Sequence, residues 1–168
     1  MTGSRSTAAV EWLTSAAPDP DACRWAWQRD PQGIVLLPAG KLWDVLIVPG
    51  ALGRPTLDVL LRLVGRPGPV LAALRVRRTG FFVPPGTASG WAGAGARGCG
   101  PGAGIVVPRP GRAAGGVRWL APPDGSGTLT DAGLLERAMH EAAGAAAGSA
   151  RAPRQAARDA GRRRRPDG

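Results

Sequence analysis

Hydrophobic positions along this chain follow two periods, one typical of strands and one typical of helices. Residues 33–48 contain two apolar runs around Pro-Ala-Gly-Lys, which predicts two strands joined by a turn. The expected helices cover residues 6–16, 20–29, 55–64 and 130–147, and the expected strands cover 33–37, 42–48, 69–76, 80–83, 105–107 and 117–120. This order predicts an α+β fold with a mostly antiparallel sheet of about five to six strands and helices packed on one face.

Several polar and aromatic residues help to place the helices. Asp19 is expected to cap the second helix, with Pro20 at its first position. Thr130 is expected to cap the last helix. Trp25 and Trp27 are two residues apart and cannot share a helix face, so one is expected in the core and the other partly exposed.

The strand at 42–48 carries one carboxylate, Asp44. Because alternate residues of a strand share a face, Asp44 is expected to point the same way as Leu42, Leu46 and Val48. A charge inside a strand is costly unless it is paired or bound to a metal. Two interpretations stay open: Asp44 forms a salt bridge with an arginine at an open face, or it is an active or vestigial metal ligand. A two-metal site on this face needs a second acid at position 46, where the chain has leucine.

Length and composition indicate the number of domains and the type of genome. The 168 residues suffice for one domain of common size. One lysine stands against 21 arginines, asparagine is absent, and glycine, alanine and proline are abundant, which is typical of a high-GC bacterial genome. The net charge is +10, and seven arginines and two aspartates within 151–168 supply half of it.

The charge distribution predicts a folded domain over 1–148 and a disordered, arginine-rich tail over 149–168. Such a tail favours nucleic acid, with an affinity that falls steeply with salt, or it is a solvated extension without a partner. The candidate nucleic-acid contacts in the tail are Arg162, Arg163, Arg164 and Arg165.

Several functional classes find little support in the sequence. Cys23 and Cys99 form no C-x-x-C pair, so no structural zinc site is expected. The N-terminal residues lack the apolar core of a signal peptide, and no stretch is apolar enough to span a membrane. These features predict a cytoplasmic protein with no membrane partner. The G-x-G-x-x-G at 93–98 lacks the flanking strand and helix of a dinucleotide site, and His140 is expected on the polar side of the last helix.

A second basic cluster lies within the expected hairpin. Arg75, Arg77 and Arg78 precede Phe81 and Phe82. Arginine pairs with phosphate, and an adjacent ring can stack on a base, so this hairpin is a candidate nucleic-acid contact. The alternative is an edge hairpin kept soluble by its charge.

The order of these landmarks resembles the N-terminal domain of bifunctional DNA primase/polymerases of the archaeo-eukaryotic primase type. The resemblance covers about residues 10–140. It consists of a Trp-bearing helix followed by Asp-Pro-Gln-Gly-Ile-Val-Leu-Leu-Pro-Ala-Gly at 30–40, then Trp-Asp-Val at 43–45, Thr-Gly-Phe-Phe at 79–82, Ile-Val-Val-Pro at 105–108 and Val-Arg-Trp at 117–119.

The resemblance implies a D-x-D metal pair on the second strand and a later histidine that contacts nucleotide phosphates. Asp44 matches the first acid, whereas Leu46 occupies the place of the second and cannot bind a metal. The matching later strand has no histidine, and Arg77 or Arg78 falls nearby. Two-metal chemistry requires several carboxylates, so we expect a degenerate member of the family, with Mg²⁺ or Mn²⁺ as cofactor only if the site is active.

The sequence therefore predicts a non-catalytic primase/polymerase-like domain that binds nucleic acid or nucleotide in a replication or regulatory context. One alternative is a protein-interaction module without a nucleic-acid role. A second alternative is an active enzyme with a relocated acid such as Asp58 or Asp124. Protein partners, the preferred nucleic acid and the oligomeric state stay open.

Overall fold

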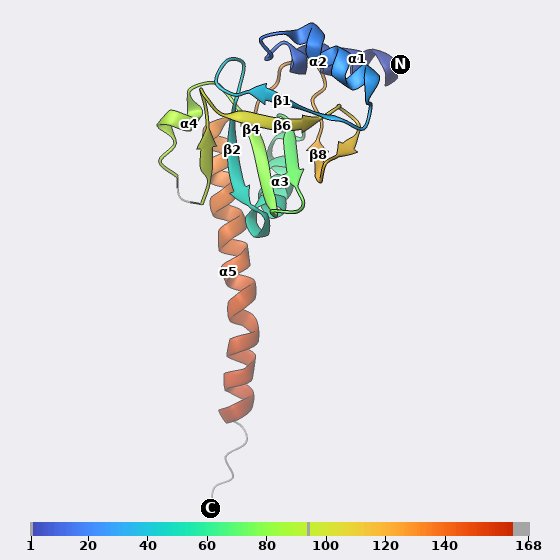
Figure 1. The fold of residues 1–168 in the computed structure, drawn as a ribbon. Coiled ribbons are helices and arrows are strands. Elements are labelled where there is room, and N and C mark those ends of the chain that lie inside the picture. The colour runs from blue at the N-terminus through green and yellow to red at the C-terminus, as the bar shows by residue number, and fades with distance from the viewer. Residues whose placement is uncertain (1, 94, 163–168) are drawn as a thin grey trace, which may run out of the picture.

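The computed structural model describes residues 2–93 and 95–162 and shows strands and helices packed together, with one long helix that projects from them (Figure 1). The helices are α1 (Thr2–Thr14), α2 (Pro20–Arg29), α3 (Gly50–Val64), α4 (Thr87–Gly90) and α5 (Ala132–Arg162). The strands are β1 (Ile34–Pro38), β2 (Asp44–Pro49), β3 (Val70–Ala73), β4 (Arg78–Val83), β5 (Arg97–Cys99), β6 (Gly104–Pro108), β7 (Ala113–Ala114) and β8 (Val117–Ala121).

The strands form two antiparallel sheets. Six strands pair in the order β5-β2-β4-β3-β8-β7, and β1 pairs separately with β6. Every ladder is antiparallel, with Val45 opposite Phe82 and Leu36 opposite Val106. The predicted α+β class and the six-stranded, antiparallel main sheet are confirmed.

The six-stranded sheet separates two hydrophobic layers. Helices α3 and α5 pack on one face, where Leu46 and Phe81 meet Leu60 and Leu135. The β1–β6 pair lies over the other face together with α1 and α2 (Figure 1). The main sheet is therefore covered from both sides, by α3 and α5 on one face and by the β1–β6 pair with α1 and α2 on the other.

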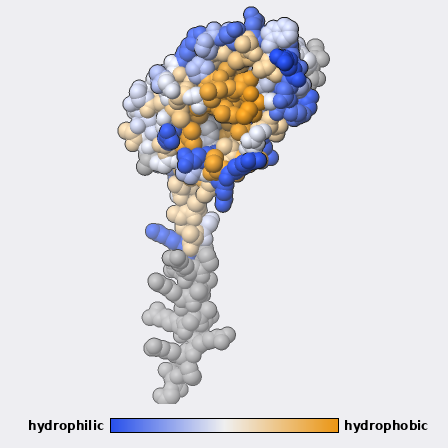
Figure 2. Space-filling view, viewed as in Figure 1, coloured by the Kyte–Doolittle hydropathy of each residue, from blue (hydrophilic) through white to orange (hydrophobic). Residues whose placement is uncertain are grey.

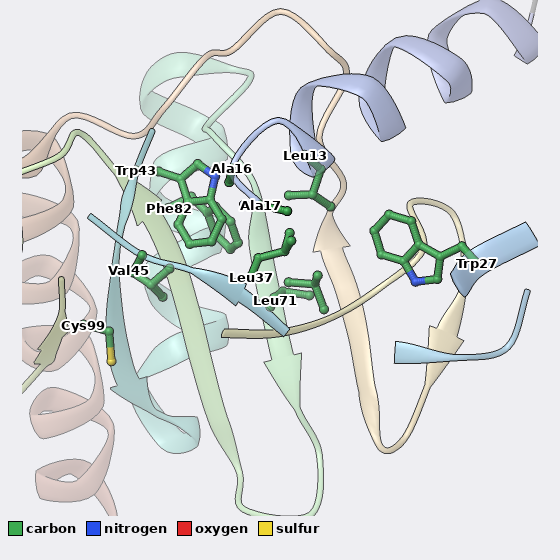
Figure 3. Packing of buried hydrophobic residues seen from close by; sticks show 12 residues of the cluster. Leu13, Ala16, Ala17, Trp27, Leu37, Trp43, Val45, Leu71, Phe82 and Cys99 are labelled. Atoms are coloured by element: carbon green, nitrogen blue, oxygen red, sulfur yellow. The ribbon is translucent and has the colours of Figure 1, made fainter. Parts of the chain in front are cut away.

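Figure 3 shows the layer beneath α1, where Trp43 and Phe82 lie against each other. Their ring centroids are 4.5 Å apart, and Trp119 follows at 5.7 Å from Phe82. Trp27 is buried and Trp25 is 63% exposed, which confirms the prediction for this pair. These rings give a core with few aromatics a continuous centre.

Helix ends agree with the sequence at α2 and differ at α5. The Asp19 carboxylate accepts a hydrogen bond from the Ala22 amide at 3.0 Å, as predicted for the cap of α2. At α5, however, the cap is Asp131, whose carboxylate accepts from the Leu134 amide at 2.9 Å. Thr130 is buried and accepts from the Gly68 amide at 3.0 Å, so it fastens a loop instead.

The C-terminal region differs most from the prediction. Helix α5 continues through Arg162, whereas the sequence predicts a helix end near residue 147 and disorder over 149–168. Arg163, Arg164 and Arg165 lie outside the described residues. The alanine-rich composition explains the longer helix, because alanine has the highest helix propensity of all residues.

The glycine-rich segment 86–104, for which the sequence predicts neither a helix nor a strand, contains the short elements α4 and β5. Both are too short to show a hydrophobic period in the sequence. Within the described ranges, no helix has the length and apolar character needed to cross a membrane.

Candidate functional site

A groove lies between the open face of the six-stranded sheet and the edge of the β1–β6 pair. It holds about 210 Å³ of free space. Its floor consists of Val45 and Ile47 from β2, Gly80 from β4, and apolar residues of β3 and β8. Strand β6 forms its wall, and Arg78 stands at its end. Figure 2 shows an apolar area on this side of the body, bordered by hydrophilic side chains.

Strand alternation determines which residues of β2 reach the groove. Val45 and Ile47 line it, whereas Leu46 and Val48 belong to the core beneath α3 and α5. Asp44 shares the parity of Leu46, so it also points away from the groove. The predicted common face holds for Asp44, Leu46 and Val48, and this face is the closed one. It is wrong for Leu42, which lies before β2 begins and packs against the other core cluster.

The Asp44 carboxylate is completely buried. Its Oδ2 accepts a hydrogen bond from the Ala88 amide at 2.9 Å, at the start of α4. A Cβ placed on Gly100 would lie 3.6 and 3.7 Å from the two carboxylate oxygens, so the backbone closes over the group. Oδ1 has no hydrogen-bond partner in the described part of the chain. Asp44 thus holds α4 against β2.

The predicted salt bridge of Asp44 is not found. Among the described residues, the ion pairs involve Glu11, Asp21, Asp58 and Glu141, and none involves Asp44. The buried position explains the difference, because an arginine would have to lose its hydration to reach the carboxylate.

The residues present do not fit the pair of divalent cations that the family resemblance implies. Such a pair needs several carboxylates that hold the two ions about 4 Å apart. Throughout residues 2–93 and 95–162, no group of three or more His, Cys, Asp or Glu side chains could hold a metal ion. Asp44 offers one carboxylate, and one of its oxygens is already bonded to Ala88.

The two acids considered as relocated ligands have other partners. Asp58 pairs with Arg54 at 3.3 Å on the exposed side of α3, four residues apart on the helix. Asp124 accepts hydrogen bonds from the amide and hydroxyl of Ser126 at 2.9 and 2.5 Å. These bonds, and secondarily the nearby Arg66, lower the pKa of the Asp124 carboxyl. Each acid is therefore engaged locally.

The hairpin arginines are exposed at the end of the groove. Arg75 and Arg77 lie in the turn between β3 and β4, and Arg78 begins β4. Arg77 has a positive φ of 48°, and its carbonyl accepts a hydrogen bond from the Gly50 amide at 2.5 Å. A Cβ on Gly50 would lie 2.5 Å from that oxygen, so glycine is required for α3 to hold the turn.

Three more arginines, which the sequence analysis did not single out, gather around this hairpin. Arg54 and Arg118 share a hollow of about 410 Å³ with Arg77 and Arg78. Arg97 shares another hollow, of about 470 Å³, with the same pair. Of all these arginines only Arg54 has a carboxylate within 4.0 Å among the described residues. The "arginine rim" is defined here as Arg54, Arg75, Arg77, Arg78, Arg97 and Arg118. No local sequence signal finds it, because it draws on four separated segments.

The predicted stacking of Phe81 and Phe82 on a base is wrong. Both rings are completely buried, one in each layer of the core. Because successive residues of a strand face opposite sides of the sheet, Phe82 packs against Trp43 and Phe81 packs beneath the helices. The hairpin offers guanidinium groups and aliphatic surface, and no exposed ring.

The other sequence candidates lie apart from the groove. His140 is exposed on α5, as expected. The described part of the 93–98 glycine motif leads into β5, and no helix follows it as a dinucleotide site requires. Arg162 ends α5.

Comparison with known families decides the relationship. A family model described as "Bifunctional DNA primase/polymerase, N-terminal" matches residues 2–138, which include both sheets and the start of α5. The chain belongs to this family. Searches of curated proteins and of solved structures found no significant match. Its membership confirms the resemblance seen in the sequence, and the family match ends before the projecting part of α5.

Proposed function

We propose that this primase/polymerase-family domain binds single-stranded nucleic acid in the groove and does not catalyse polymerisation. The observation that supports it most is the kind of charged residue that lines the groove. Exposed Arg78 lines the groove, and none of the described residues lining it is an acid. Exposed Arg77 and Arg97 share an adjoining hollow with Arg78, and none of the three has a carboxylate within 4.0 Å in the described part of the chain. Positive charge without an opposing carboxylate attracts phosphates, and it leaves no ligands for the metal ions of phosphoryl transfer.

Single strands suit the groove better than duplexes. Its free space is about 210 Å³, and half-buried Ile47 with exposed Val76 and Val106 offers apolar contact to unstacked bases. The backbone of the strand would follow the arginine rim, where guanidinium groups pair with phosphates. A mononucleotide uses the same chemistry with fewer phosphates, so we expect it to bind more weakly.

Fluorescence anisotropy with a labelled oligonucleotide of about 20 nucleotides tests the binding, and the double variant Arg77→Ala/Arg78→Ala is the probe. Each lost phosphate contact lowers the slope of log affinity against log salt by about 0.7 for single strands. We expect the double variant to bind about tenfold more weakly at low salt, with a smaller slope. Arg29→Ala, an exposed arginine at the end of α2, is the matched control and keeps wild-type binding. Equal affinities of the two variants would contradict the proposal.

Primer extension with Mn²⁺ and labelled nucleotides tests the absence of catalysis. We expect no template-dependent product. The variant Asp44→Asn keeps the shape and an oxygen for the Ala88 amide, and Asp58→Asn serves as its matched control. Synthesis by the wild type that disappears only in Asp44→Asn would show that Asp44 is a working metal ligand and would overturn the non-catalytic assignment.

A protein-interaction module is the second candidate function. Ile34, Leu36 and Val106 expose 46, 65 and 39% of their surface on the outer face of the β1–β6 pair. Apolar side chains gathered on a surface are typical of partner contacts. The variant Leu36→Ser leaves the arginine rim intact, so unchanged oligonucleotide binding by this variant separates the two functions.

A further inference from the structure

Helix α5 has two parts with different surroundings. Its first part is buried through Leu135, Ala138, Met139 and Ala142, and Glu141 pairs with Arg62 of α3 at 2.5 Å. From residue 143 through residue 151 every side chain is exposed. Figure 1 shows the helix continuing away from the body as far as Arg162. We call residues 143–162 the "arm"; at about 1.5 Å per residue its backbone extends for about 30 Å.

The arm carries arginines at helical spacing. Arg151, Arg154, Arg158 and Arg162 follow each other at intervals of three, four and four residues. Backbone positions at these intervals lie on one side of an α-helix, here over a length of about 16 Å. Asp159 is the one acid among residues 143–162, so the arm has a net charge of +3. An ordered row of positive positions thus runs along a helix that stands clear of the body.

The composition of the arm excludes two common roles for a projecting helix. Residues 143–162 contain no Leu, Ile, Val, Met or aromatic residue. A coiled coil needs large apolar residues at every third and fourth position. A helix that lies in a membrane interface needs an apolar face of similar residues. Alanine, glycine and arginine predominate instead, which leaves charge as the main means of recognition.

We propose that the arm binds double-stranded nucleic acid as a helix, a role that rests on the nucleic-acid function proposed above. An α-helix with short side chains is about 10 Å across and fits the major groove of B-DNA, which is about 12 Å wide. Small residues between the arginines let the helix approach closely, and the arginine row runs beside the phosphates. The groove is proposed for a single strand, and the arm, which continues a helix on the opposite face of the main sheet, is proposed for a duplex.

The arm on its own is a weak helix, and binding should strengthen it. Pro153 has no amide hydrogen and cannot donate to the carbonyl of Ser149, which weakens the helix at that point. Gly144, Gly148 and Gly161 lower its propensity further. A helix without tertiary contacts is marginal in water, so helical content should rise when the duplex is bound.

Two charge-neutral substitutions test whether the helix, and not only its charge, is recognised. Ala156→Pro breaks the helix between the arginines, Pro153→Ala strengthens it, and Ala156→Ser is the matched control. The full chain is titrated with a labelled duplex of about 20 base pairs and with a single strand of the same sequence. We expect Ala156→Pro to weaken duplex binding at least about fivefold, Pro153→Ala to tighten it, and the control to match the wild type.

A second readout is circular dichroism at 222 nm. We expect the helical signal to increase on addition of duplex to the wild type and Pro153→Ala, and to stay constant for Ala156→Pro. The pair Arg154→Gln/Arg158→Gln should lower the salt slope for duplex by about two. Unchanged duplex affinity in both proline variants would overturn the proposal, because a flexible polycation would then suffice. Tighter binding to phosphatidylserine vesicles than to duplex at equal salt would also overturn it.

The same titrations separate this proposal from the proposed function. Loss of single-strand binding in Arg77→Ala/Arg78→Ala with intact duplex binding supports the arm and the groove as independent sites. If the chain binds no single strand but its duplex binding changes in the proline variants, the groove proposal is contradicted and the arm proposal is supported. If the chain binds single strands and its duplex binding is the same in the proline variants, only the proposal for the arm is contradicted.

Discussion

The two faces of strand β2 have opposite surroundings. Asp44, Leu46 and Val48 are completely buried on the face that α3, α4 and α5 cover. Val45 and Ile47 form the floor of the groove on the other face, which the β1–β6 pair covers only in part. The one carboxylate of the strand is therefore enclosed, and the accessible face is apolar. An acid on β2 acts on a substrate only if it has the parity of Val45 and Ile47.

An acid introduced on each face in turn should show the largest difference. Leu46→Asp places a carboxylate in the closed core without a partner, and we expect a loss of about 5 kcal/mol or more, enough to unfold a typical domain. Ile47→Asp places it in the groove that Arg78 borders, where water and positive charge are available. We expect that variant to lose about 1–2 kcal/mol, since it gives up part of a buried side chain.

Urea unfolding followed by circular dichroism measures both variants. Leu46→Asn and Ile47→Asn are matched controls that introduce polarity without charge. Ile47→Asp should also weaken single-strand binding, because the new carboxylate repels phosphates. Equal destabilisation by the two aspartates would show that the groove floor is as closed as the core, which would contradict the description of the two faces.

The capping role of Asp44 gives an effect of intermediate size. Asp44→Ala leaves the Ala88 amide without its acceptor, and an unsatisfied buried donor costs about 1–3 kcal/mol. Asp44→Asn keeps an acceptor oxygen and introduces no cavity, so we expect less than about 1 kcal/mol of change. Thermal unfolding at neutral pH measures both. Equal destabilisation by Asp44→Asn and Asp44→Ala would contradict the interpretation that Asp44 stabilises the domain by supplying an acceptor oxygen to the Ala88 amide.

The two faces of β2 show which features of the fold can be predicted from the sequence and which cannot. Periodicity placed the main helices and strands, and it correctly paired Asp44 with Leu46 on one face. It could not tell which face is open, because that depends on where the β1–β6 pair lies. This pair joins residues about 70 positions apart, as in the register of Ile34 with Pro108.

The arginine rim and the end of α5 escaped prediction for different reasons. Arg97 sits on β5, a strand of three residues in a glycine-rich segment, and Arg54 and Arg118 come from other elements. Their proximity is a product of the fold and has no local pattern. For α5, the charge of the last residues predicts disorder, but their alanine-rich sequence also favours helix.

The smallest expected change in stability comes from Asp124. This residue lies on neither face of β2, so its effect is a baseline for the substitutions on that strand. Hydrogen bonds from Ser126 lower the pKa of its carboxyl below the ordinary value of 3.8. A carboxyl with a lowered pKa stabilises the folded state above its unfolded pKa, and the contribution disappears as the pH falls through the folded pKa. Because the group is exposed, we expect less than about 0.5 kcal/mol after screening by solvent. Ser126→Ala should lower stability slightly at pH 7 and leave it unchanged near pH 2, in urea titrations at both values. A larger loss at pH 2 than at pH 7 has the wrong sign for a lowered pKa and would assign the effect of Ser126 to its bond with Thr128 instead.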